Sequence, residues 1–160
     1  MRGAVSYFLV VLFYAAVAAA GRGFTAEGIM AWYPALEKPP YTPPGTFIAV
    51  AWTSIYVLTA LSLIVFIRTG RTRGPLAPVV ALYVVNGVIN AAWSYVFFVE
   101  HLLALAALDA LLIALSVLAL ILLVRRRSPA AAVLLVPYLL WSSFATYLAW
   151  DVYRLNSPAG

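Results

Sequence analysis

Residues 32–56 read WYPALEKPPYTPPGTFIAVAWTSIY, and this stretch decides how the rest of the chain is interpreted. Its first 13 residues hold five of the ten prolines in the chain. Proline lacks an amide donor and fixes φ, so a segment this rich in proline cannot form a regular helix or a central strand. We therefore expect an ordered loop. It continues directly into an apolar segment in which Trp52 and Tyr56 have helical i, i+4 spacing.

The composition indicates a membrane protein. The 160 residues are 66% hydrophobic and only 9% charged, which is more apolar surface than one globular core of this size can bury. Lipid must therefore surround most of the chain. Five apolar runs are each close to the roughly 20 residues that cross a bilayer. We predict an all-α membrane protein, a bundle of five transmembrane helices in a single integral membrane domain (1–160), with helices over 3–21, 46–67, 76–99, 102–124 and 130–150 and a ligand-covering loop over 22–45.

The charges are distributed unevenly along the chain. If five helices alternate in direction, seven arginines fall on one side: Arg2, Arg68, Arg71, Arg73, Arg125, Arg126 and Arg127. By the positive-inside rule, this side and the N-terminus are cytoplasmic in a multi-pass protein of the cell membrane, and the long first loop and the C-terminus lie on the opposite side. The net charge of +5 then reflects loops near lipid head groups, so we expect membrane lipid and no nucleic acid as a partner.

The first apolar run allows a second interpretation. Arg2, the run itself and the small residues at 18–21 also resemble a cleavable signal peptide. We favour a retained helix, because the four remaining spans would otherwise have to close a bundle without it.

Polar and aromatic side chains converge at one depth. Asn86, Asn90 and Trp93 lie on one stripe of the third span. Counted from the outer end of each span at about 1.5 Å per residue, Trp52 and Trp93 are about 9 Å deep, and Asn90 and Trp141 about 13 Å deep. Rings and a few polar groups at one level, on several helices, are what a pocket for a flat, mainly apolar ligand requires.

Each of these residues also has a purely structural interpretation. Tryptophan and tyrosine form interfacial belts, which suits the loop residues Trp32 and Tyr33 as well as a binding site does. Buried asparagines bond helix to helix as often as they contact ligands. Asp109, about 10 Å deep, is either a functional acid or a protonated structural group. We interpret His101, in the turn between the third and fourth spans, as a solvated loop residue.

The chemistry of conventional enzymes is missing from the sequence. Cysteine is absent and there is one histidine, so we expect no metal site and no tightly bound cofactor. Axial ligation of haem is poorly supported as well, so stacking would have to hold any tetrapyrrole.

At this point the residues resemble the translocator protein family, also called tryptophan-rich sensory proteins (TspO/MBR). The matching motifs span most of the chain in the family's order. They are Trp32-Tyr33 to Leu36, Lys38-Pro39, Pro43-Pro44, Trp52-Thr53 with Tyr56, Asn90-x-x-Trp93-Ser94 with Phe97-Phe98, Pro137-Tyr138, Trp141, Ala145-Thr146 and Arg154-Leu155-Asn156.

This resemblance implies a five-helix bundle, usually a homodimer, that binds porphyrins and, in some members, sterols beneath the first loop. Family pocket positions carry over to Trp32, Tyr33, Trp52, Asn90, Trp141 and Ala145. The chain departs from the family at Asn86, where many members have glutamine, at Tyr41, where the loop usually has tryptophan, and at Ala149, where asparagine is common.

Sterol binding is doubtful. The sterol-recognition pattern needs a tyrosine followed, after one to five residues, by a cation. Tyr153 directly precedes Arg154, and Tyr147 is separated from Arg154 by six residues, so the pattern fails at the end of the last span.

We predict a membrane receptor or binding protein for porphyrins, protoporphyrin IX or haem, with a role in tetrapyrrole handling or stress signalling. One alternative is a light-dependent porphyrin-degrading enzyme, with Trp52 and Trp141 as candidate catalytic residues. Another is a porphyrin or lipid transporter, for which Asp109 is the only evident coupling group. The predicted ligand-binding residues are Trp32, Tyr33, Trp52, Tyr56, Asn86, Asn90, Trp93, Trp141 and Ala145.

Overall fold

The computed structural model describes residues 2–70 and 76–157, and within these ranges all regular secondary structure is helical. The six helices are α1 (Arg2–Gly28), α2 (Trp32–Ala35), α3 (Gly45–Gly70), α4 (Ala77–Phe98), α5 (Leu103–Val124) and α6 (Pro129–Asn156). Five of them, all except α2, are long and apolar enough to cross a membrane. The predicted all-α, five-span architecture is therefore confirmed.

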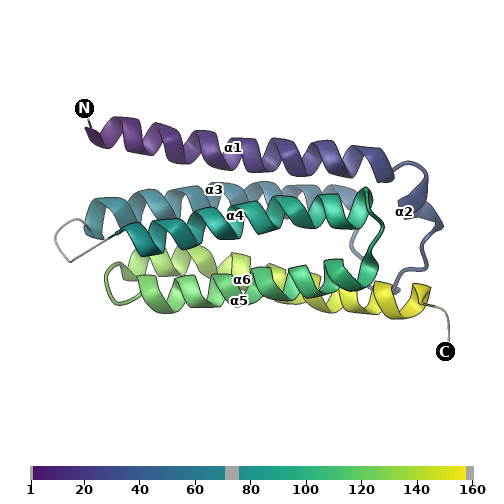
Figure 1. Ribbon diagram of the computed structural model, residues 1–160. Coiled ribbons are helices and arrows are strands. Elements are labelled where there is room, and N and C mark those ends of the chain that lie inside the picture. Colours follow the sequence, from purple (N-terminus) through teal and green to yellow (C-terminus); the bar gives the residue numbers. More distant parts are fainter. Residues whose placement is uncertain (1, 71–75, 158–160) are drawn as a thin grey trace.

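The five long helices form a closed ring (Figure 1). Going round the ring, the order is α1, α3, α6, α5, α4 and back to α1, and each neighbouring pair is in contact. Successive spans run in opposite directions, so the short turn at Glu100 and His101 makes α4 and α5 antiparallel neighbours, as predicted. The ring buries the inward face of each helix and leaves leucines and valines on the outside, where lipid would contact them.

The two ends of the ring differ in character. Residues 29–44, which join α1 to α3 and include α2, cover one end, and we call this segment the lid (Figure 1). The C-terminal end of α6 lies at this lid end, whereas the N-terminus of α1 and the turn between α5 and α6 lie at the other. Arg68, Arg125, Arg126 and Arg127 belong to this second end, which we call the arginine end. Arg71 and Arg73 lie outside the described residues.

The first and last helices are longer than predicted. α1 continues to Gly28 instead of ending at residue 21, and α6 continues to Asn156 instead of ending at residue 150, so the loop predicted over 22–45 is shorter, at 29–44. Hydropathy detects only the part of a helix that lies in lipid, and no proline follows either predicted end within the helix. The polar side chain of Thr25 even bonds back to the Gly21 carbonyl, at 2.8 Å.

The lid also contains a feature that its proline content was predicted to exclude. Trp32–Ala35 forms one helical turn, with Pro34 at its third position. Proline is tolerated in the first turn of a helix because the amide it lacks would have no intrahelical partner there. The Lys38 ammonium then donates to the carbonyls of Tyr33 at 2.8 Å and Leu36 at 2.6 Å, which satisfies acceptors at the end of this turn.

The arginine-end half of the ring interior is filled by side chains. Its fully buried residues include Phe66, Tyr83, Leu120 and Leu135 from four different helices. The Tyr83 hydroxyl lies 2.7 Å from Ser62 Oγ, which in turn donates to the Ala131 carbonyl at 2.7 Å. These two hydroxyls are thus paired within the protein, as a water-free interior requires.

Small residues allow close helix contacts within the ring. Ala107, Ala110 and Ala149 form a buried cluster that joins α5 to α6. Gly87 of α4 faces α1, where a Cβ atom would lie 2.7 Å from the Phe13 ring. The closest contact involves Gly28, the last residue of α1, which lies directly against the backbone of α4.

Gly28→Ala should therefore destabilise the protein. A Cβ atom at this position would lie 2.5 Å from the Phe98 carbonyl oxygen, and backbone cannot move aside as a flexible side chain can. We expect a loss of about 1–3 kcal/mol, the usual cost of overpacking, seen as a lower thermal unfolding midpoint in detergent. Gly23→Ala on the same helix is the matched control, because nothing lies within 4 Å of its new Cβ atom. Equal midpoints for the two variants would contradict this account of the α1–α4 contact.

Candidate functional site

Aromatic rings from α3 and α6 meet in the lid-end half of the bundle. The Trp52 ring centroid lies 5.9 Å from that of Tyr56, 6.1 Å from that of Tyr138 and 6.4 Å from that of Trp141. Tyr56 stacks on Trp52, as the i, i+4 spacing predicts, whereas Tyr138 and Trp141 approach edge-on. We call these four residues the α3–α6 aromatic group. All four are buried or partly buried, so the rings face the protein and not the acyl chains.

Asn90 of α4 bonds to two members of this group from the opposite side of the helix bundle. Its Oδ1 accepts a hydrogen bond from the Tyr56 hydroxyl at 2.6 Å, and its Nδ2 donates to the Tyr138 hydroxyl at 3.0 Å. One amide side chain therefore links α3, α4 and α6. Asn86, one turn nearer the arginine end, donates from Nδ2 to Ser116 Oγ of α5 at 2.8 Å, so the two asparagines together reach three other helices.

Three buried polar atoms near these residues have no hydrogen-bond partner among the described residues. They are Trp141 Nε1, Asn86 Oδ1 and Asp109 Oδ2. Leaving such a group unpaired in a medium without water costs free energy, so each is a position where an added molecule would gain a hydrogen bond. Trp141 Nε1 is a donor inside the α3–α6 aromatic group, and it would serve a ligand that carries an acceptor.

The first part of the lid rests on α4 and on the turn that follows it. The Trp32 ring packs edge-on against Phe97 at 5.1 Å between centroids and stacks on His101 at 4.0 Å. Tyr33 lies 5.8 Å from Phe98, with the Lys38 ammonium 4.8 Å from its ring centroid. His101 is exposed and lies outside the helices, as predicted. Its φ is positive, at 59°, and its ring also contacts Trp32.

Trp93 belongs with this lid contact and not with the α3–α6 aromatic group. Its ring stacks on Phe97 at 4.9 Å, and its Nε1 donates to the Ala106 carbonyl of α5 at 2.9 Å. Trp52, Trp93 and Trp141 pack against the same buried cluster, but the ring contacts of Trp93 in the described residues are with Phe97 and Phe98. Trp93 follows Asn90 by three residues, which turns it about 60° around the helix, away from α3 and towards α5.

The second part of the lid is fastened to the end of α6. The Glu37 amide donates to Asn156 Oδ1 at 3.0 Å, and Asn156 Nδ2 donates back to the Glu37 carbonyl at 2.8 Å. The Tyr41 hydroxyl donates to Asp151 Oδ2 at 2.5 Å, and the Tyr41 ring stacks on Tyr147 at 5.7 Å. We call these contacts the α6 latch. The lid thus spans from α4 to α6 across the end of the ring.

The lid tyrosines keep their protons at physiological pH. Desolvation by its surroundings and the hydrogen bond to Asp151 raise the pKa of Tyr41 above its ordinary value of 10.0, and burial raises the pKa of Tyr33. Because a raised tyrosine pKa favours the protonated form in the folded state, the Tyr41 contribution to the α6 latch is complete below pH 10 and is lost only at higher pH.

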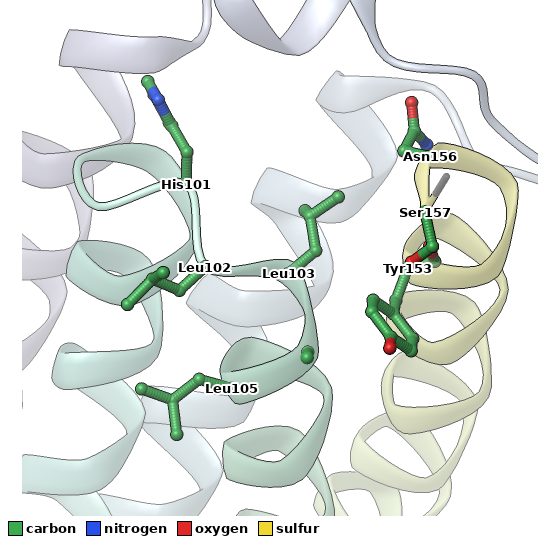
Figure 2. A pocket seen from close by; sticks show the side chains of 8 residues that line it. His101, Leu102, Leu103, Leu105, Tyr153, Asn156 and Ser157 are labelled. Atoms are coloured by element: carbon green, nitrogen blue, oxygen red, sulfur yellow. The ribbon is translucent and has the colours of Figure 1, made fainter. Parts of the chain in front are cut away.

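A shallow depression opens beside the lid and not beneath it. Its lining joins the turn before α5 and the first turn of α5, from His101 to Leu105, with Tyr153, Asn156 and Ser157 at the end of α6 (Figure 2). It holds none of the predicted ligand-binding residues. Beneath the lid, the α3–α6 aromatic group and its hydrogen bonds occupy the space where a ligand pocket was expected.

Most predicted site residues lie in these two groups. Trp52, Tyr56, Asn90 and Trp141 are in contact, and Ala145 is half-buried one turn from Trp141 towards the lid. Trp32, Tyr33 and Trp93 form the other group through Phe97 and Phe98.

The sequence interpretation missed the roles of Tyr138, Asp151 and Asn156. The family motifs include Tyr138 and Asn156, but the spacing within the sequence gives no sign of what they contact.

The sequence comparisons identify the family. A family model described as TspO/MBR matches residues 9–154, which is nearly the whole chain. The chain belongs to the TspO/MBR family. The resemblance noted from the tryptophan and proline motifs is thereby confirmed.

Relatives in this family come from bacteria and animals. The tryptophan-rich protein TspO of Bacillus cereus is 41% identical over 125 residues, covering 78% of this chain and 80% of that protein. The tryptophan-rich sensory protein of Cereibacter sphaeroides is 32% identical over 148 residues, or 91% of each chain. The translocator protein of Ovis aries is 32% identical over 126 residues, covering 78% of this chain and 75% of that protein.

Family membership and the five apolar helices together make this chain an integral, multi-pass membrane protein. The names of its relatives, translocator protein and tryptophan-rich sensory protein, support a membrane receptor role. Which molecule the lid and the aromatic groups receive is a separate question.

Asn156→Ala should loosen the lid without disturbing the bundle. The substitution removes both hydrogen bonds to the Glu37 backbone, each with a net value of about 1 kcal/mol. We expect the Glu37 amide to exchange its hydrogen roughly 5- to 30-fold faster, measured by hydrogen–deuterium exchange of lid peptides. Ser143→Ala is the control, because its hydroxyl bonds only to the Leu139 carbonyl of its own helix in the described contacts. Unchanged lid exchange in Asn156→Ala would show that the latch does not hold the lid.

Proposed function

We propose that this protein is a membrane receptor for porphyrins, which bind beneath the lid within the α3–α6 aromatic group. A porphyrin is a large, flat, mainly apolar ring with acceptor groups at its edge. Such a ligand needs aromatic faces to stack on and a few fixed polar groups to orient it. Protoporphyrin IX and haem are the members of this class that we expect, held by stacking and not by axial ligation.

The observation that carries the proposal is the unpaired indole donor of Trp141. This half-buried side chain lies 6.4 Å from Trp52 between ring centroids, and its Nε1 is buried without a partner among the described residues. A ligand that displaces the edge-on contact between the two indoles would gain an aromatic face to stack on. It would also supply an acceptor that the protein lacks.

The lid supports the proposal through its stiffness. Five prolines in 13 residues restrict the conformations of the open lid, so less entropy is lost when the lid closes over a ligand. The α6 latch provides contacts that can open and close without unfolding a helix.

The packed arginine-end half favours binding over passage through the bundle. Phe66, Tyr83 and Leu120 are completely buried there, on three different helices. In this conformation, packed side chains therefore block the path of a ligand from beneath the lid to the arginine end. Entry and exit at the lid end, or between helices, suit a receptor better than they suit a transporter that works along the bundle axis.

Trp52→Ala and Trp141→Ala should each weaken porphyrin binding. Loss of one stacking ring removes about 0.5–1.5 kcal/mol in addition to the contribution of its buried area, so we expect affinities roughly tenfold lower. The measurement is a titration with protoporphyrin IX, followed by the absorbance of the porphyrin so that the number of tryptophans does not affect the signal.

Trp150→Ala is the matched control for this titration. Trp150 is on the same helix as Trp141, but it is 47% exposed and its described ring contact is with Tyr153, outside the α3–α6 aromatic group. Its affinity should equal that of the unmodified protein. If Trp52→Ala and Trp141→Ala also keep that affinity, porphyrin binds elsewhere and the proposal is wrong.

A second candidate function is light-dependent breakdown of the bound porphyrin. The observation in its favour is that Trp52 contacts three other oxidisable rings, those of Tyr56, Tyr138 and Trp141. Such a group can exchange electrons with an excited porphyrin without any acid or base catalyst.

Illumination of the porphyrin complex distinguishes the two functions. An enzyme would form a product that is absent in darkness and is lost in Trp52→Phe, which keeps an aromatic ring but removes the indole. A receptor without this activity would leave the absorbance spectrum of the bound porphyrin unchanged by light, apart from the bleaching that free porphyrin shows in the same detergent.

A further inference from the structure

Arg125 and Arg126 at the arginine end carry positive charge, and the acidic side chains of the chain lie elsewhere. The sequence has five acidic residues, and four of them, Glu27, Glu37, Glu100 and Asp151, lie at the lid end. The fifth, Asp109, lies in the lid-end half of α5. Among the described residues, no carboxylate lies at the end of the bundle that carries Arg125 and Arg126.

The backbone compensates only a small part of this charge. Arg125 is the C-cap residue of α5, and its amide still bonds to the Ile121 carbonyl at 2.9 Å. The C-terminus of a helix is equivalent to roughly half a negative charge. Arg125 and Arg126 are both exposed, so most of their charge must be balanced by ions or molecules outside the protein.

Apolar side chains lie immediately beside these cations. Leu122, Leu123, Arg125, Arg126 and Arg127 line one depression of the surface. Leu122 and Leu123 are 46% and 51% exposed, on a helix that crosses the membrane, so they face acyl chains. Leu122 lies in the last turn of α5, and Arg126 lies in the turn that follows, so the two residues border the same depression.

We propose that this depression binds an anionic phospholipid. The head-group phosphate would lie against the guanidinium groups of Arg125 and Arg126, which match phosphate geometry through paired N–H donors. An acyl chain would lie along Leu122 and Leu123. Charge complementarity selects this occupant, because a zwitterionic lipid brings no net negative charge to an end of the protein that has no carboxylate of its own.

The leucines distinguish a lipid from a free phosphate ion. A soluble anion would use the arginines alone and would gain nothing from the apolar part of the depression. A phospholipid satisfies both parts at once, at the depth where head groups meet hydrocarbon. Binding of this kind is independent of the lid, because the depression lies at the opposite end of the bundle from α2 (Figure 1).

The test is lipid binding to the full-length protein in a neutral detergent. Native mass spectrometry would measure the affinities for phosphatidylglycerol and phosphatidylcholine of matched chain length. We expect phosphatidylglycerol to bind roughly tenfold or more tightly, because each arginine near an anionic head group contributes to the attraction. The double variant R125Q/R126Q should reduce this preference to about twofold or less.

Two controls complete the experiment. R22Q/R154Q removes the same charge from two exposed arginines at the lid end, and it should keep the preference for phosphatidylglycerol. The thermal unfolding midpoint of R125Q/R126Q in lipid-free detergent should equal that of the unmodified protein, which would verify that the variant is folded. If the midpoint of R125Q/R126Q is lower, R125K/R126K replaces it as the test, because it keeps the charge. This second variant should retain the preference for phosphatidylglycerol.

Three results would overturn the proposal. The first is equal affinity of the unmodified protein for the two lipids, and the second is a preference that R125Q/R126Q retains. The third is displacement of phosphatidylglycerol by millimolar inorganic phosphate, which would indicate an anion site that does not need the acyl chains.

Discussion

The structure depends on how a buried amide finds partners where water is absent. Asn90 is 4% exposed in the interior of a bundle that lipid surrounds, so both ends of its amide must be bonded within the protein. Its two partners, the hydroxyls of Tyr56 and Tyr138, come from α3 and α6. This pairing fixes how α3 and α6 are rotated towards α4. It also sets where Trp52 lies, since Trp52 is one turn from Tyr56 and contacts both tyrosines.

The lid follows from this arrangement because it closes the end of the bundle above the aromatic group. Ring contacts of Trp32 with α4 and the following turn hold its first half, and the α6 latch, which combines hydrogen bonds with the Tyr41–Tyr147 ring contact, holds its second half. The hydrogen bonds of the latch lie at an exposed surface, where the bonded groups can exchange their partners for water. The latch half is therefore the part of the lid that can open, and α6, which carries both Trp141 and Asn156, connects the site to its cover.

Much of the fold could be predicted from the sequence, because hydrophobic length and turn residues are local signals. The five spans, the antiparallel pairing of α4 with α5 and the Trp52–Tyr56 stack follow from such signals. The extensions of α1 and α6 into the polar region and the single turn of α2 do not follow from these signals, because such short helical segments leave the hydropathy pattern unchanged. The latch contacts join residues 110 and 119 positions apart, and no spacing rule connects Tyr41 to Asp151 or Glu37 to Asn156. The direction of Trp93 depends on which α4 residues face the centre of the ring, and the stripe alone left that open.

The central claim is that the two indoles on α3 and α6 form the walls of a porphyrin site beneath the lid. The most direct measurement is an experimental structure of the protein with protoporphyrin IX bound. The account predicts porphyrin density beneath residues 29–44, in contact with Trp52, and an acceptor atom within hydrogen-bond distance of Trp141 Nε1. Porphyrin density on the lipid-facing surface, with the Trp52–Trp141 contact unchanged and Nε1 still unpaired, would contradict it.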